Sequence, residues 1–182
     1  MVRVFNFYEQ LDYAERYSHY LNSFYTKIYP VKSIEIIYDK ILQKKGVDKI
    51  LHMENKDIKI DEKIESIKAT KNIVFEDKVD IDNDISGWLE TGVETDIVTF
   101  YQVKVGKIYM IPHKDMKEMY TLYKEDWLKN NQWKIIYNDF GGNIVKGRIF
   151  LVPKQEVFDF LHNKNNIKWE EFEFDASKYI YP

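Results

Sequence analysis

Three charged side chains in the first third of the chain have the types and spacing to hold a divalent cation beside a phosphate. Asp48 precedes a short apolar run, and Asp61 and Lys63 stand two residues apart in the next run. Two carboxylates supply hard oxygen ligands, and a bound cation activates water and neutralises charge on a phosphate. A nearby ammonium group stabilises charge on the attacking water or the transition state. These three residues are the candidate catalytic set.

The segments that carry these residues predict a β-hairpin. Lys49–Met53 reads as a short apolar strand, and after a polar tip Ile58–Ile64 alternates between apolar and charged residues. Because successive side chains of a strand point to opposite faces, Asp61 and Lys63 are expected on one face. Glu62 is then expected on the other face, as a charge at the rim.

Five short motifs in series resemble the PD-(D/E)XK nuclease-like superfamily: GVDKI, IDEKI, NIVFE, SGWL and KIYMIP. They are most similar to small members carried by phages and mobile elements. The resemblance covers residues 34–120, and a looser similarity continues to about residue 161. It implies a restriction-endonuclease-like core and a nuclease that acts on DNA with Mg²⁺ or Mn²⁺ held by Asp48 and Asp61. Lys63 would assist the attacking water.

The resemblance also implies supporting acids. Members of this superfamily bring an acid from the third strand, here Asn72–Asp77, which makes Glu76 an additional candidate metal ligand. Others contribute an acid from the helix before the first core strand. A helix is predicted from an N-cap at Ser33 to a C′ glycine at Gly46, and Glu35 and Asp39 are the candidates by position. Both acids could instead be solvated charges on a helix rim.

A second acid-x-Lys triplet, Glu76-Asp77-Lys78, competes with the first. The triplet at residues 61–63 is preferred because it directly follows the strand that begins after Asp48. The acidic segment 78–86 is predicted to be a solvated, mobile loop near the site, or equally an acidic patch that mimics DNA. Trp88, after a glycine, either packs in the core or wedges a base.

Length and composition indicate one soluble globular domain. The resemblance implies that it is of α/β (α+β) class, with a central mixed β-sheet flanked by helices and an N-terminal helix. The 182 residues are 45% hydrophobic and 16% aromatic, enough for one cored domain. Its expected parts are an N-terminal helical extension (1–31), the nuclease-like core (32–120) and a C-terminal strand–helix extension (121–182). The chain has no cysteine, and its N-terminus lacks a secretory h-region. We therefore expect a cytoplasmic protein of a prokaryotic host.

The net charge of −3 argues against unspecific DNA binding, which normally relies on a basic excess. Four lysines, at positions 40, 44, 45 and 49, are nevertheless expected to make the entry to the site basic. A nuclease needs positive charge only around its groove. The overall acidity still favours a protein partner over tight binding to DNA.

Helical spacing of apolar residues predicts a tyrosine-rich helix over residues 8–29, which Pro30 ends. Its tyrosines either pack on the sheet or form a protein-binding surface. Later, KIYMIP followed by a helix and RIFLVP followed by a helix form two similar units. They predict two strand–turn–helix units packed on one sheet.

The alternative hypothesis keeps the fold and makes binding the function. A small, acidic, cysteine-free chain with a Lys, Ile, Asn and Tyr bias is typical of phage-like inhibitors of host defence. Its partner would be a host CRISPR effector nuclease with its guide RNA. The tyrosine-rich helix, the segment 80–84 or the acidic C-terminal tail would form the contact.

Overall fold

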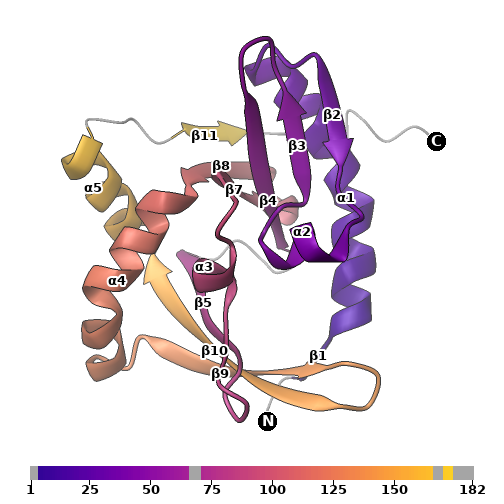
Figure 1. Ribbon diagram of the computed structural model, residues 1–182. Helices are drawn as coiled ribbons and strands as arrows, with labels where there is room; N and C mark the ends of the chain where they lie inside the picture. The colour runs from indigo at the N-terminus through magenta and orange to yellow at the C-terminus, as the bar shows by residue number, and fades with distance from the viewer. Residues whose placement is uncertain (1–3, 66–70, 166–169, 174–182) are drawn as a thin grey trace.

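The computed structural model describes residues 4–65, 71–165 and 170–173, which form two mixed β-sheets and five α-helices (Figure 1). In spatial order the six-stranded sheet consists of β11 (Glu170–Glu173), β8 (Lys107–Pro112), β7 (Ile97–Gln102), β4 (Asp57–Glu65), β3 (Lys49–His52) and β2 (Ser33–Ile36). The five-stranded sheet consists of β1 (Val4–Asn6), β9 (Trp133–Asp139), β10 (Ile144–Pro153), β5 (Asn72–Asp80) and β6 (Ile85–Ser86). The mixed α/β class predicted from the sequence is confirmed.

The helices are α1 (Phe7–Ile28), α2 (Lys40–Lys44), α3 (Trp88–Thr91), α4 (His113–Lys129) and α5 (Lys154–Asn165), with a 3₁₀ turn η1 (Val103–Val105). The predicted tyrosine-rich helix is therefore α1. Its tyrosines divide between two environments, because Tyr25 is fully buried whereas Tyr8 is 58% exposed. Among the described residues, no helix combines the length and apolarity that would let it cross a bilayer.

The predicted hairpin is confirmed as β3 and β4, which pair in an antiparallel register with Lys49 opposite Ile60. On its other side β4 pairs in parallel with β7. The period of two along β4 places Ile58 and Ile60 against α1, in a core that also contains Leu21, Phe24, Tyr25, Leu51, Tyr101, Ile108 and Met110. The face with Asp61 is directed the other way.

A second core fills the space on the other side of the six-stranded sheet. It joins Val98 and Phe100 of β7 to Ile73 and Phe75 of β5, and it continues onto the inner faces of α4 and α5. Burial of each of these side chains contributes about 1.5–3 kcal/mol to stability. The candidate catalytic face of β4 therefore lies on the side of the second core.

Two expectations about local structure are wrong. Residues 33–36 form strand β2 instead of the start of a helix, because Ile34 and its neighbours pair with β3. Asp39, and not Ser33, caps the short helix α2 with its side chain. Segment 78–86 is a compact hairpin turn: Asp80 accepts a hydrogen bond from the Asn83 amide, and Lys78 pairs with Asp84 at 2.7 Å.

The two similar units form as predicted, each a strand that runs into a helix at a proline. Pro112 ends β8 before α4, and Pro153 ends β10 before α5. The expectation that both lie on one sheet is wrong. β8 belongs to the six-stranded sheet and β10 to the five-stranded sheet, because β10 pairs with β5 and β9. Sequence similarity between the units carries no information about their pairing partners.

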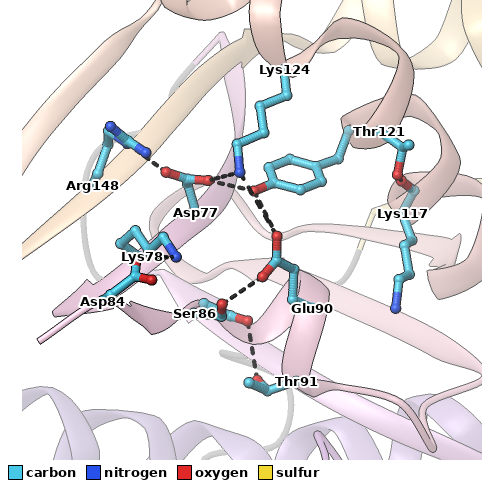
Figure 2. Close-up of polar contacts among 12 residues, drawn as sticks. Asp77, Lys78, Asp84, Ser86, Glu90, Thr91, Lys117, Thr121, Lys124 and Arg148 are labelled. Carbon is cyan, nitrogen blue, oxygen red and sulfur yellow. Dashed lines mark hydrogen bonds and ion pairs between the residues drawn. The ribbon is translucent and has the colours of Figure 1, made fainter. Parts of the chain in front are cut away.

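A buried carboxylate connects four elements (Figure 2). Asp77 of β5 accepts hydrogen bonds from Tyr120 of α4 and Arg148 of β10, and Lys124 Nζ lies 2.8 Å from Asp77 Oδ1. Glu90 of α3 joins through the Tyr120 hydroxyl, 3.3 Å from Glu90 Oε1. Burial raises the pKa of Asp77, but its donors together lower it below the ordinary value. The ionised carboxylate therefore holds α3 and α4 against the five-stranded sheet.

We expect Lys124→Met to lower the free energy of unfolding by about 2 kcal/mol, because it removes one charged donor from a buried carboxylate. Lys129→Met on the same helix is the matched control. Lys129 pairs with Asp126 at 3.7 Å with both side chains exposed, so its loss should change stability by less than about 0.5 kcal/mol. Urea denaturation of both variants measures the difference. Equal effects would contradict a structural role for the Asp77 network.

Candidate active site

The structure brings Asp61 and Lys63 together on one face of β4. Lys63 Nζ lies 2.7 Å from Asp61 Oδ1. The Asp61 side chain is only 3% exposed, whereas that of Lys63 is 30% exposed. The ion pair therefore joins a buried carboxylate to a lysine whose side chain is partly exposed.

Asp48 lies beside this pair at the start of β3. Its backbone N–H donates to the carbonyl of Ile60 at 2.8 Å, so the hairpin pairing continues to Asp48. Its Oδ2 accepts a hydrogen bond from the backbone N–H of Glu62 at 2.7 Å. The Asp48 carboxyl is also close enough to Asp61 to share a hydrogen bond when one of the two is protonated. The three predicted catalytic residues thus converge.

The carboxyl group of Asp61 has an unusually high pKa. Burial and, to a smaller extent, the charge of Asp48 raise its pKa to about 7, against the opposing charge of Lys63. Within the described part of the chain, no hydrogen-bond donor reaches Asp61 Oδ2. A buried oxygen without a donor is costly, so this atom is suited to a positively charged partner.

Lys63 is held in its charged form. Burial lowers the pKa of Lys63, but the charges of Asp61 and Asp48 outweigh this and leave the pKa above its ordinary value. A permanently protonated lysine cannot remove a proton from water. Its chemistry is therefore stabilisation of negative charge.

Glu76 approaches the site from β5 of the other sheet. Its charge acts on Lys63, and its Oε2 accepts a hydrogen bond from the Trp88 backbone N–H at 3.4 Å. Burial raises the pKa of Glu76, against the opposing charge of Lys63. Among the described residues, no three acidic or histidine side chains form a group that could hold a metal ion. Glu76 therefore does not complete a three-carboxylate site with Asp48 and Asp61.

The competing triplet does not form a second site. Lys78 pairs with Asp84, and Asp77 belongs to the network of Figure 2. Of the two acid-x-Lys triplets, the one at residues 61–63 is next to Asp48.

Trp88 contributes to the site in a way the sequence did not predict. Lys63 Nζ lies 5.0 Å from the centroid of the Trp88 ring. The same ring packs edge-on against Phe100, with 6.2 Å between centroids. Gly87 lets the start of α3 lie close against β5, since a Cβ there would be 2.1 Å from the Glu76 carbonyl oxygen. The glycine before Trp88 was the one feature of the sequence that indicated a close contact at this position.

Gly46 borders Asp61 on another side. It has φ +79°, as expected of a C′ glycine after α2. A Cβ at this position would meet Thr95 Oγ1 at 2.6 Å and lie 3.7 Å from Asp61 Oδ2. Gly46 itself therefore places no side chain against Asp61 Oδ2.

A buried ion pair lies directly behind the site, and it contradicts two expectations. Glu62 is not a rim charge: its carboxylate is 4% exposed, 2.9 Å from Lys49 Nζ, and accepts hydrogen bonds from Ser18 at 2.6 Å and Tyr25 at 3.0 Å. Lys49 is not part of a basic entry, because its ammonium group donates to Asn22 at 2.7 Å beneath α1. Burial raises the pKa of Glu62, and Lys49 opposes that rise.

The two predicted supporting acids have other contacts. Glu35 of β2 lies 3.2 Å from His52 Nε2. The Asp39 side chain accepts hydrogen bonds from the first backbone N–H groups of α2, at 2.7 and 3.1 Å. Neither carboxylate contacts Asp61 or Lys63, so the structure does not bring these acids into the site.

Comparison of the chain with protein-family models, with curated proteins and with solved structures finds no match. The geometry of Asp48, Asp61 and Lys63 is therefore the basis for assigning a function to the chain.

Proposed function

We propose that the chain is a divalent-cation-dependent nuclease that hydrolyses phosphodiester bonds, with DNA as the expected substrate. One observation carries this proposal: the buried Asp61 has an oxygen without a donor, beside a second carboxylate and a charged lysine. The carboxylate oxygens of Asp61 and Asp48 fit Mg²⁺ or Mn²⁺, which prefer such ligands. The resemblance of the sequence motifs to PD-(D/E)XK nucleases supports the same proposal.

The roles of the chain's own residues follow from their surroundings. Asp61 and Asp48 would hold the cation, which when bound activates water and neutralises charge on the phosphate. The Glu62 backbone N–H fixes the direction of Asp48. Lys63, protonated and partly exposed, stabilises the negative charge that develops on the phosphate.

The test is nicking of supercoiled plasmid by the purified chain with Mg²⁺ or Mn²⁺ and with EDTA. We expect Asp61→Ala and Lys63→Ala each to reduce cation-dependent nicking by at least about a hundredfold, since both remove groups that stabilise the transition state. Equal cleavage by wild type and both variants would defeat the mechanism.

The chain supplies a matched control on the same strand. Asp57-Ile58-Lys59 repeats the acid-x-Lys spacing, but Asp57 pairs with His52 at 2.9 Å and Lys59 with Glu94 at 2.7 Å. Asp57→Ala and Lys59→Ala should therefore leave nicking within about twofold of wild type. If all four variants lost nicking activity to a similar extent, the cause would be damage to the strand and not the loss of two specific groups.

The second candidate function is inhibition of a host CRISPR effector nuclease by binding. It is favoured by the lack, among the described residues, of a third ligand beside Asp48 and Asp61. Pull-down of an effector–guide RNA complex distinguishes the two functions. Retention of binding by Asp61→Ala, with no cleavage by wild type, would favour the inhibitor. Cation-dependent cleavage without any partner would favour the nuclease.

A further inference from the structure

An open groove of about 350 Å³ lies between α4 and α5, which are neighbours in Figure 1. The buried side chains of Met119 and Trp127 line it, together with Tyr123, which is 41% exposed, and the half-buried Phe160. No residue of the candidate active site is among its lining residues. The groove is therefore a second, separate feature of the surface.

Aromatic rings form much of this lining. The Tyr123 ring stacks on Trp127 with 6.3 Å between centroids and meets Phe160 edge-on at 6.1 Å. The faces of such rings carry partial negative charge, so they attract ammonium and guanidinium groups. The chain itself contains an example, because Lys164 Nζ lies 5.9 Å from the Phe160 centroid while it pairs with Asp115 at 2.9 Å.

Two carboxylates complete the groove. Glu156 and Asp159 are exposed and stand three residues apart on α5, a spacing that places them on one side of the helix. Asp159 accepts a hydrogen bond from Gln155 at 2.8 Å. Within the described part of the chain, neither carboxylate forms an ion pair. The groove therefore combines an apolar base with two exposed carboxylates.

We propose that this groove binds a basic peptide segment of a partner protein, in which a lysine or arginine adjoins an apolar side chain. The carboxylates and ring faces complement the cationic group, and the apolar base accommodates the neighbouring side chain. The volume of the groove falls in the range of ligand pockets, roughly 300–1,000 Å³, and exceeds what one ammonium ion needs. This inference does not depend on the nuclease proposal.

The experiment is selection of peptides from a random phage-displayed library on the intact wild-type chain. We expect enriched peptides that contain lysine or arginine next to an aliphatic or aromatic residue. The synthesised peptides should bind the Glu156→Gln, Asp159→Asn double variant at least about tenfold more weakly, because both carboxylates that face the cationic group lose their charge. Glu125→Gln, an exposed acid of α4 outside the groove, should bind them as wild type does.

A second pair of variants tests the aromatic wall without the charges. Tyr123→Phe keeps the ring and should retain affinity, whereas Tyr123→Leu removes the ring face and should weaken binding about fivefold. Circular dichroism confirms that each variant is folded.

The proposal would be overturned by the absence of enriched peptides, or by enriched peptides without basic residues. Affinities that the double variant leaves unchanged, or a self-association of the chain that the double variant abolishes, would overturn it as well. Displacement of the peptides by equimolar spermidine would also overturn it, because the groove would then be a small-cation site.

Discussion

Mn²⁺ is expected to stabilise wild-type protein at about pH 8 by about 3 kcal/mol when its concentration is a hundredfold above the dissociation constant. Asp61→Asn should abolish this stabilisation. The reason is that the cation would occupy the position beside the buried Asp61 Oδ2, which has no donor among the described residues. Binding only to the folded state raises the free energy of unfolding, whether or not any bond is cleaved.

Without a cation, stability should fall as the pH rises from about 4 to about 7. The folded pKa of Asp61, about 7, lies above its unfolded value of 3.8. Between these values the folded state retains a proton that the unfolded state has released, so a rise in pH favours unfolding. The full span corresponds to a loss on the order of 4 kcal/mol.

The variant Asp61→Asn also separates this effect from ordinary destabilisation. It cannot titrate, and it leaves Lys63 with Asp48 and Glu76 as neighbouring charges. At about pH 8 without cation we expect it to be more stable than wild type by about 1 kcal/mol. Urea denaturation across this pH range, with Mn²⁺ and with EDTA, measures all three quantities. An Asn variant that still responds to Mn²⁺ would place the cation elsewhere.

Lys49→Met is expected to lower the free energy of unfolding by about 3–5 kcal/mol. It would leave the Glu62 carboxylate buried behind the site without its cation. Replacing both partners with apolar residues, as in Lys49→Met with Glu62→Leu, should recover most of this loss, because no charge then remains buried. The two charges therefore depend on each other.

Chemical denaturation of the two single variants and the double variant forms the required cycle. Lys32→Met is the control, since Lys32 pairs with Glu54 at 3.5 Å with both side chains exposed. Additive losses in the double variant would contradict the interpretation of a coupled buried pair.

The sequence predicted the features that local periodicity determines. Alternation along β4 placed Asp61 and Lys63 on one face, and helical spacing with Pro30 defined α1. The prolines at 112 and 153 marked both strand-to-helix junctions. Convergence of Asp48 with this pair followed from the hairpin.

Features that depend on distant segments were not predictable in this way. Ile34 and its neighbours have a spacing that suits either a helix or a strand, and pairing with β3 decides the outcome. The partner of Lys49 lies across α1 and β4, so its sequence neighbours suggested a surface lysine. The division into two sheets depends on the choice of partners for β5 and β10.

The order of the strands determines how the molecule must unfold. The chain passes from β1 in the five-stranded sheet to β2–β4 in the other, back for β5 and β6, across for β7 and β8, back again for β9 and β10, and across once more for β11. Neither sheet is formed by one continuous segment of the chain. The chain therefore cannot be divided at a single position into two segments that each form one sheet. Such interleaving gives many contacts between distant residues, which slows folding and favours a single cooperative transition.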